Sequence, residues 1–281
     1  MTEKHRSFRV LGNIALVNFP EEMSTKDKKV FAKNILDNNK SIRTVVEKVG
    51  NFKGKLRKQT TKYIAGENTK EVIYRENGCE FRFNIDETYF SSSLAGERKE
   101  VCSFVMPDDE VLAMFAGIAP FPIVIAKNVP VKKIYSNELN RKANKYAEMN
   151  IKRNKVSDKV ELLPGDIKKV AIKLKDEGRT FDLILMTRPN LDESFLEEAF
   201  MVSKSGTRIY YHAFCHVSEK EDQINMIKDE AKKFGFEVKI LNTKDIGDIA
   251  PGKVRFRVLF EVRKGFVLCR RFRNWCRDLC K

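Results

Sequence analysis

The pattern of apolar and polar positions predicts one arrangement of strands and helices before residue 90 and a different one after it. Before it, Phe8–Phe19 predicts a strand-like segment broken at Gly12-Asn13 by a hairpin or bulge, and Ser24 is placed to cap a helix ending at about Asn38. The further strands expected here are Thr44–Val49, the basic segment Phe52–Gly66, and a hairpin of Val72–Tyr74 and Glu80–Ile85 that turns at Asn77-Gly78. These segments predict a small α+β domain over residues 1–90.

Beyond residue 90, strands and helices alternate. The expected strands are Val111–Phe115, Lys133–Ser136, Val160–Leu163, Leu183–Met186, Thr207–Ala213 and a closing antiparallel pair, Phe236–Leu241 and Val254–Val262. The expected helices are Glu97–Phe104, Phe121–Asn128, Arg141–Asn154, Lys168–Glu177, Ser194–Val202 and Glu219–Phe234. This alternation predicts an α/β domain over residues 91–264, with a parallel, doubly wound sheet.

The charge of the chain narrows its partners. Its formal net charge is +15, from 54 Lys and Arg against 39 Asp and Glu. Such an excess favours a polyanionic partner, nucleic acid first and an anionic membrane surface second, although lysine-rich solvated faces are also common. There is no apolar run of the roughly 18 to 20 residues that span a bilayer, and no leader pattern at the start. The sequence therefore predicts a cytoplasmic protein that does not cross a membrane.

Cysteine and histidine usage argues against a metal centre. Cys79, Cys102 and Cys215 stand singly, which is typical of reduced, buried thiols, and the chain has three histidines. The remaining three cysteines, Cys269, Cys276 and Cys280, lie in the arginine-rich segment 265–281 without a histidine nearby, which makes a poor zinc site. We interpret residues 265–281 as a basic tail.

Candidate chemistry gathers at three successive strand ends. The small-residue turn at Ala116-Gly117 follows the first strand, Glu138 follows the second about twenty residues later, and Gly165-Asp166 follows the third. An acidic side chain in the second position can accept both ribose hydroxyls of a nucleoside cofactor, and Asp166 is placed to contact adenine. Since no G-x-G-x-x-G is present, S-adenosylmethionine fits better than a dinucleotide. The alternative is that Glu138 and Asp166 only cap the helices that follow them.

The segment Met114–Phe121, MFAGIAPF, closely resembles the MFAGVGPF motif of the archaeal and eukaryotic tRNA (guanine-37-N1)-methyltransferases. Ordered matches continue along most of the chain, at Gly54–Arg57, Ala65–Asn68, Arg75–Gly78, Tyr89–Ser91, Leu94–Arg98, Glu138–Asn140, Asn150-Ile151, Asn154, Gly165-Asp166, Met186–Pro189, Ile209–His212 and Ala250–Gly252. The resemblance implies a Rossmann-like class I S-adenosylmethionine-dependent methyltransferase domain preceded by a small RNA-facing domain. The implied substrate is the guanosine 3′ to the anticodon, in the anticodon stem-loop of tRNA.

The resemblance also implies roles for individual residues. Methylation of guanine N1 requires removal of its proton and stabilisation of charge on O6, and these tasks would fall on Glu97 and Arg57. Tyr89 would lie near the pocket, with Thr187 beside the target base. The implied cofactor-binding residues are Phe115, Ala116, Gly117, Phe121, Glu138, Leu139, Asp166, Ile167 and Pro189.

Four positions depart from the family pattern. Thr187 replaces the Asn of an Asn-Leu-Pro motif, and one hydroxyl cannot reproduce the paired hydrogen bonds of an amide. Ser93 stands where the family has an Arg, Ala113 where it has an acidic residue, and Ala119 where it has a second Gly. These changes weaken the case for ordinary guanine methylation more than the case for cofactor binding.

Two further functions stay open. A sister branch of the same superfamily transfers the aminocarboxypropyl group of S-adenosylmethionine in wybutosine-type base synthesis, and it lacks the Asn-Leu-Pro motif. The chain could also be a tRNA-binding protein on a decayed methyltransferase scaffold. We expect a monomer in each case.

Overall fold

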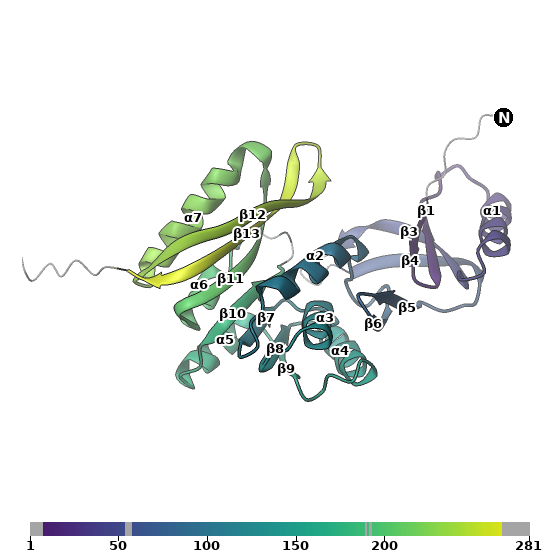
Figure 1. Ribbon diagram of the computed structural model, residues 1–281. Coiled ribbons are helices and arrows are strands. Elements are labelled where there is room, and N and C mark those ends of the chain that lie inside the picture. Colours follow the sequence, from purple (N-terminus) through teal and green to yellow (C-terminus); the bar gives the residue numbers. More distant parts are fainter. Residues whose placement is uncertain (1–7, 54–57, 189, 191–192, 266–281) are drawn as a thin grey trace, which may run out of the picture. The chain divides into compact units, whose positions relative to one another are not determined.

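The computed structural model describes residues 8–53, 58–188, 190 and 193–265 (Figure 1). Arg57, Pro189 and the three cysteines of the predicted tail, Cys269, Cys276 and Cys280, lie outside the described residues. By its contacts the chain divides into two compact units. The first consists of Met1–Val170 with Leu185–Pro189, and the second of Ala171–Ile184 with Asn190–Lys281.

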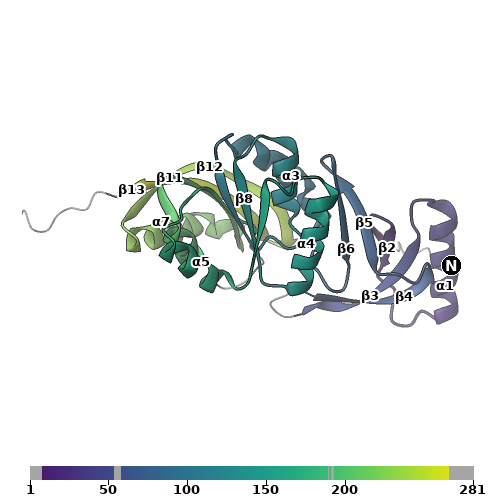
Figure 2. The ribbon, with the colours of Figure 1, turned by 90° about the horizontal axis from the view of Figure 1, so that it is seen from below.

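The first unit begins with a four-stranded sheet and one helix. Its elements are β1 Phe8–Leu11, β2 Ile14–Val17, α1 Thr25–Asn38, β3 Thr44–Lys53 and β4 Lys58–Gly66, with strand order β1-β2-β3-β4. Ser24 caps α1 as predicted, since its side chain accepts a hydrogen bond from the N–H of Asp27. Helix α1 packs against β3 and β4 (Figure 2), and buries Ala32 and Ile35 in one cluster with Val17 and Val45.

A two-stranded hairpin and a short helical segment follow. The elements are β5 Glu71–Glu76, β6 Cys79–Asn84, the 3-10 turn η1 Ser92–Leu94, α2 Ala95–Glu100 and the 3-10 turn η2 Val101–Phe104. Asn77 and Gly78 have φ values of 48° and 73°, and two positive φ values in succession are what a type I′ hairpin turn needs. The predicted hairpin is therefore confirmed, whereas the single helix predicted over 97–104 is an α-helix that continues as a 3-10 turn.

The second half of the chain contributes a seven-stranded sheet in the order β12-β13-β11-β10-β7-β8-β9. Its strands are β7 Glu110–Met114, β8 Lys133–Glu138, β9 Val160–Pro164, β10 Phe181–Met186, β11 Ser203–His216, β12 Phe236–Ala250 and β13 Lys253–Lys264. The helices between them are α3 Pro120–Asn128, α4 Arg141–Arg153, α5 Ile167–Asp176, α6 Leu196–Met201 and α7 Lys220–Lys233, with η3 Val217–Glu219 before α7. Strands β7, β8 and β9 are parallel, and β13 runs antiparallel to β11 and β12. The predicted α/β class and the closing antiparallel pair are confirmed.

The three C-terminal strands are longer than the sequence predicts. Polar and glycine residues such as Gly206 and Gly247 interrupt the apolar pattern, so β11 and β12 read as short segments. In the structure, β13 is hydrogen-bonded to β11 on one side and β12 on the other, and these two ladders carry the strands past the interruptions. Backbone pairing here overrides local propensity. Across the described residues, no helix has the length and apolar character that crossing a membrane requires.

Candidate cofactor and catalytic site

The turn between β7 and α3 is held in an uncommon backbone conformation. Phe115, Gly117 and Ala119 have φ values of 60°, 58° and 64°, so every second residue of the turn is left-handed. Glycine adopts this region freely, but for residues with a β-carbon it costs about 1 kcal/mol or more. The turn is held by hydrogen bonds, among them one of 2.8 Å from the Ala116 N–H to the carbonyl of Asn137 on β8. Backbone strain that is over-determined in this way is a mark of ligand sites.

Glu138, at the end of β8, closes the turn with its side chain. Its Oε2 accepts a 2.8 Å hydrogen bond from the Gly117 N–H, and its Oε1 accepts one of 2.6 Å from the Asn140 N–H. Burial raises the pKa of Glu138, and the N–H groups of Asn140 and Gly117 oppose that rise. Both oxygens keep lone pairs in addition to those that accept the two N–H groups. The carboxyl group can therefore accept hydroxyl groups of a ligand.

The third strand end lies beside the second. The Gly165 N–H donates to the Glu138 carbonyl at 2.9 Å, and the Asn137 amide donates to the carbonyls of Leu163 and Gly165. Asp166 is exposed, and its Oδ1 accepts a 3.0 Å hydrogen bond from the Lys168 N–H. The structure thus brings Gly117, Glu138 and Asp166 to one edge of the sheet.

The capping alternative describes part of this geometry. Glu138 accepts the N–H of Asn140 just before α4, and Asp166 accepts the N–H of Lys168 in the first turn of α5. Capping alone does not account for Glu138, because its second oxygen reaches across to the Phe115–Ala119 turn. A residue that only caps a helix needs no partner in a neighbouring βα turn.

Apolar side chains that the sequence assigns to the cofactor differ in exposure. Leu139 is 47% exposed, whereas Phe121 and Ile167 are buried at the starts of α3 and α5. Phe115 is half-buried and Ala116 is buried. Leu139 is therefore the member of this set with most of its surface available to a ligand.

Helix α2 places Glu97 on a rigid support. Glu97 is 6% exposed, and the next residue, Arg98, forms a buried ion pair with Glu76 in which Nη2 donates to Oε2 at 2.8 Å. The Arg98 guanidinium also lies 4.9 Å from the ring centroid of Phe90 and 5.6 Å from that of Phe121, in the first turn of α3. Breaking a buried pair of this kind costs about 3–5 kcal/mol, so the helix that carries Glu97 is anchored to the hairpin and to α3.

The segment before α2 lies against the same turn. The Tyr89 carbonyl would be 3.6 Å from a β-carbon placed on Gly117, and the Asn140 amide donates to the Glu87 carbonyl at 2.9 Å. Tyr89 itself is half-buried. The structure therefore brings the backbone of Tyr89 to Gly117, and a role for its side chain in the pocket stays a prediction.

The remaining candidates are placed less fully. Thr187 is half-buried directly after β10, and Ser93 is exposed with its hydroxyl 2.8 Å from that of Ser91. Arg57 and Pro189 lie outside the described residues, so the structure does not place the residue expected to contact O6. Within the described ranges, no three His, Cys, Asp or Glu side chains gather as a metal site would require.

Two features of the site were not found from the sequence. Asn140 holds the Glu87 carbonyl and caps α4 through Lys142 N, and its position after Glu138-Leu139 at a helix start was the available signal. The Arg98–Glu76 pair joins residues 22 positions apart on different elements, and no local pattern announces it.

Comparison with protein families matches both halves of the chain. The TRM5/TYW2 methyltransferase domain matches residues 72–241, and the TYW2 N-terminal domain matches residues 1–69. The chain is 33% identical to Trm5b of Pyrococcus abyssi, a tRNA (guanine(37)-N(1))-methyltransferase, over 91% of this chain and 74% of that protein. The crystal structure of that protein has a TM-score of 0.79, with 92% of this chain and 75% of that chain covered at 32% identity.

Two more relatives extend the comparison. The chain is 30% identical to Taw22 of Nanoarchaeum equitans, named a tRNA (guanine(37)-N(1))/4-demethylwyosine(37)-methyltransferase, over 90% of this chain and 98% of that protein. A structure of aTrm5 in complex with tRNALeu has a TM-score of 0.77 and 26% identity, covering 91% of this chain and 71% of that chain.

Proposed function

The chain belongs to the TRM5/TYW2 methyltransferase family, and from that membership we propose that it methylates N1 of guanosine 37 in tRNA with S-adenosylmethionine as donor. The observation that carries the proposal is the carboxylate of Glu138, which bridges the left-handed Phe115–Ala119 turn and the start of α4. The net charge of +15 supports an RNA substrate.

The donor set at the three strand ends fits a nucleoside cofactor. Glu138 offers carboxylate oxygens to the ribose hydroxyls, Leu139 offers an exposed apolar surface, and Asp166 has one carboxylate oxygen that Lys168 does not use. Gly117 lets the backbone approach the ligand, because no side chain stands there. S-adenosylmethionine, when bound, supplies an electrophilic methyl group; the residues named here bind and orient it.

The chemical step requires the N1 proton to leave guanine. Glu97 is proposed as the base that accepts it, and its place on the anchored helix α2 supports a fixed geometry for the transfer. Arg57 is proposed to donate hydrogen bonds to O6 as negative charge develops there. Thr187 would make one hydrogen bond to the base in place of the amide that the family places there.

The test is mass spectrometry of nucleosides from unmodified tRNA incubated with the protein and S-adenosylmethionine. We expect one added methyl group on guanosine, mapped to position 37 by fragmentation of the anticodon oligonucleotide. Methylation at another nucleotide would contradict the proposed target. Tight tRNA binding with neither methylation nor cofactor binding would instead favour the decayed scaffold.

A second function, aminocarboxypropyl transfer, is favoured by two observations. The N-terminal match is to the TYW2 N-terminal domain, and Thr187 departs from the Asn of the methyltransferase motif. The same assay separates the two functions when it is repeated on tRNA that carries the pre-formed tricyclic base. An aminocarboxypropyl mass on that substrate, with none on guanosine, would assign the chain to the sister branch.

Four finer points remain predictions. The anticodon stem-loop is proposed as the part of the tRNA that is bound, and the chain is predicted to act as a monomer in the cytoplasm. The boundaries 1–90 and 91–264 are proposed as the RNA-facing and methyltransferase domains. Limited proteolysis would test the domain boundaries, gel filtration the oligomeric state, footprinting the bound part of the tRNA, and cell fractionation the location.

A further inference from the structure

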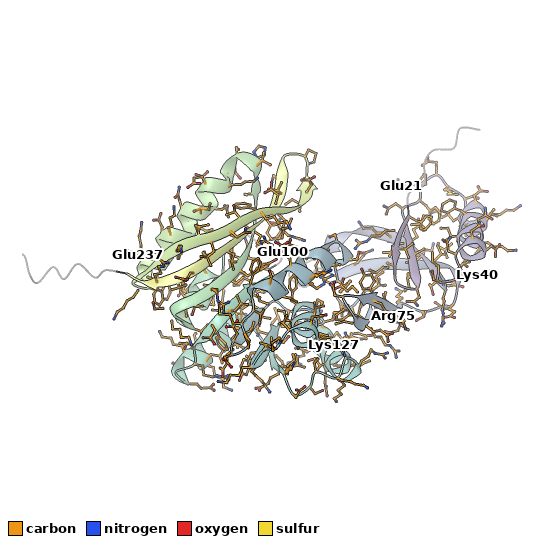
Figure 3. The ribbon with its side chains drawn as sticks, in the orientation of Figure 1. Glu21, Lys40, Arg75, Glu100, Lys127 and Glu237 are labelled. Atoms are coloured by element: carbon orange, nitrogen blue, oxygen red, sulfur yellow. The ribbon has the colours of Figure 1, made fainter. Side chains whose placement is uncertain are left out.

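A hollow of the first unit is lined by cations that the proposed reaction does not use. It is an open hollow with a volume of about 650 Å³, and it lies between the turn of the β5–β6 hairpin and the C-terminal ends of α3 and α4. We call it the basic cavity and define it by Arg75, Lys127, Arg153 and Lys155. Arg75 comes from the hairpin and Lys127 from α3 (Figure 3), so the cations converge from separate elements.

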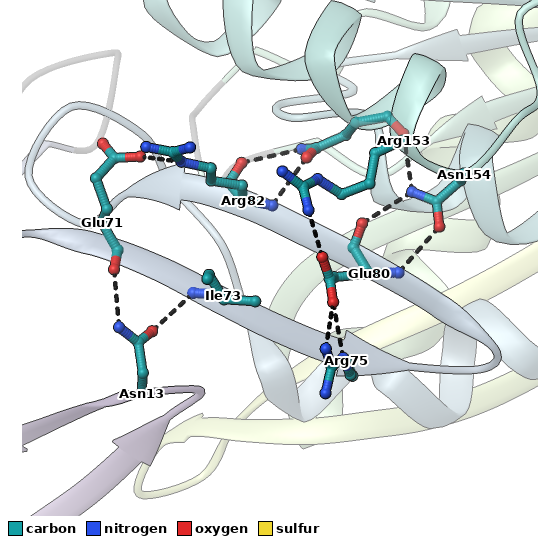
Figure 4. A network of polar contacts seen from close by, with 9 residues as sticks. Asn13, Glu71, Ile73, Arg75, Glu80, Arg82, Arg153 and Asn154 are labelled. Atoms are coloured by element: carbon teal, nitrogen blue, oxygen red, sulfur yellow. Dashed lines mark hydrogen bonds and ion pairs between the residues drawn. The ribbon is translucent and has the colours of Figure 1, made fainter. Parts of the chain in front are cut away.

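One carboxylate fixes the two arginines of the basic cavity. Glu80 on β6 accepts hydrogen bonds from Arg75 Nε at 2.8 Å and from Arg153 Nη1 (Figure 4). These two arginines, Arg75 first, hold the pKa of Glu80 below its ordinary value, so Glu80 stays ionised and the trio keeps a charge of +1. A guanidinium has five N–H groups, so each arginine retains donors for a ligand. Glu80 therefore holds both arginines in place without cancelling their combined positive charge.

The two lysines add charge that has no counter-ion nearby. Among the described residues, neither Lys127 nor Lys155 forms an ion pair, and the Lys127 ammonium reaches only the Asn154 carbonyl, at 3.4 Å. The other acidic residue of the wall, Glu76, is already paired with the buried Arg98. The lining therefore carries an uncompensated positive charge.

Amide side chains tie the walls of the basic cavity together. Asn154, at the end of α4, accepts the Glu80 N–H at 2.9 Å and donates to the Glu80 carbonyl at 2.8 Å. The Asn128 amide at the end of α3 donates to the Asn77 carbonyl in the hairpin turn at 3.0 Å. The hairpin and both helix ends are thus bonded to one another. The elements that carry the cations therefore keep their spacing without a ligand, which lowers the entropy cost of binding one.

We propose that the basic cavity binds a backbone phosphate of the tRNA substrate, at a distance from the modified base; the inference rests on the function proposed above. Arginine forks and lysine ammonium groups are the usual partners of phosphodiester oxygens. Cations near helix C-termini also stabilise the helices themselves, and Lys127 is in the last turn of α3. Arg75 belongs to a hairpin, however, and helix stabilisation does not account for it.

The test compares two double variants with equal loss of charge. Lys127→Gln/Lys155→Gln removes the unpaired lysines of the basic cavity, and Lys175→Gln/Lys232→Gln removes two exposed lysines of the second unit. Affinity for unmodified tRNA is measured against salt concentration. For the cavity variant we expect about tenfold weaker binding near 0.1 M salt, and a slope of log affinity on log salt that is smaller by about 1 than that of the control.

Three further readouts separate this inference from its alternatives. The turnover number at saturating tRNA should stay within twofold of wild type while KM rises, and Lys127→Arg/Lys155→Arg should restore the affinity. Binding and slope equal to those of the control variant would overturn the inference, as would a lowered melting temperature with unchanged binding. If the wild-type protein transfers no methyl group, the proposed reaction fails but the comparison of salt slopes still decides the phosphate site.

Discussion

Helices α3 and α4 present opposite chemistry at their two ends. At the N-terminal ends lie the Phe115–Ala119 turn and Glu138, where backbone N–H groups face a carboxylate. At the C-terminal ends lies the basic cavity, where lysines and arginines gather. The helix dipole stabilises negative charge at the first end and positive charge at the second. One pair of helices can therefore support a cofactor at one end and an RNA phosphate at the other.

Two glutamates show the same contrast in their pKa values. Glu138 accepts hydrogen bonds from neutral backbone donors, and burial raises its pKa, whereas guanidinium groups lower the pKa of Glu80. A carboxylate with neutral donors, such as Glu138, can also accept a ligand's hydroxyl groups. The Glu80 carboxylate is instead held between two arginines and acts as a structural link. Glu138, the proposed cofactor ligand, and Glu80 therefore differ in the charge of their hydrogen-bond donors.

The largest expected effect is at Glu97 on α2, the helix whose Arg98 lies against Phe121 in the first turn of α3. We predict that Glu97→Gln lowers the methyl-transfer rate by about 10²- to 10⁴-fold, because the amide cannot accept the N1 proton. Single-turnover kinetics with saturating tRNA measures this rate. Glu100→Gln on the same helix is the matched control and should change the rate less than threefold. If Glu97→Gln kept full turnover, another group or water would have to take the proton.

The next effect is on cofactor affinity. Glu138→Ala should weaken S-adenosylmethionine binding by about 10- to 100-fold, since hydrogen bonds to a charged group contribute about 1.5–3 kcal/mol. Isothermal titration calorimetry on the protein alone measures this change. Binding of tRNA should stay the same, because Glu138 lies at the other end of α4 from the basic cavity. Unchanged cofactor affinity would leave Glu138 with a structural role alone, that of holding the Phe115–Ala119 turn and the start of α4.

The same carboxylate predicts a pH dependence. Because the pKa of Glu138 is raised, the free protein keeps a proton on it at pH values where an ordinary glutamate, near 4.5, has lost it. Ribose hydroxyls donate to the ionised form, so cofactor affinity should rise with pH through this pKa and fall about tenfold per pH unit below it. Glu138→Gln should remove the dependence. A wild-type midpoint at or below 4.5 would contradict the prediction.

A change at the C-terminal end of α4 should lower the stability of the fold and leave the affinity for the cofactor unchanged. Asn154→Ala leaves the N–H and C=O of Glu80 without the amide that pairs them, and we expect the free energy of unfolding to fall by about 1–3 kcal/mol. Urea denaturation measures this change. Asn38→Ala, at the exposed end of α1, is the control and should stay within about 0.5 kcal/mol. Cofactor affinity that fell as much as in Glu138→Ala would show that the two ends are not independent.

The smallest effect is in the strained turn. Ala119→Gly should raise the free energy of unfolding by about 0.5 kcal/mol, because relief of the left-handed φ outweighs the extra chain entropy of glycine. Thermal denaturation measures the change. Ala116→Gly, in the same turn but not left-handed, should lower stability by about 0.5–1 kcal/mol. Equal losses in both variants would mean that Ala119 carries no strain.

Most of the fold follows from local signals in the sequence. The Ser24 cap and the Asn77-Gly78 turn are each set by a few neighbouring residues, and the βαβ alternation follows from the apolar pattern of each segment. The structure confirms all three. The prediction that Gly117, Glu138 and Asp166 lie at one edge of the sheet also followed from the sequence, because each comes at the end of a strand and parallel strands present their carboxyl ends at one edge. The predicted lengths of β11 to β13 were too short, because hydrogen bonds between these strands override local propensity there.

The sequence by itself determined the elements, their order and the candidate carboxylates. The tertiary structure decided how the β5–β6 hairpin is held: Asn13 bonds to Glu71 and Ile73 on β5, and Asn154 bonds to Glu80 on β6 (Figure 4). These partners stand 58 to 74 positions apart. The physical reason is that backbone N–H and C=O groups need hydrogen-bond partners, and which side chain supplies one depends on proximity in the folded chain, which no local pattern records.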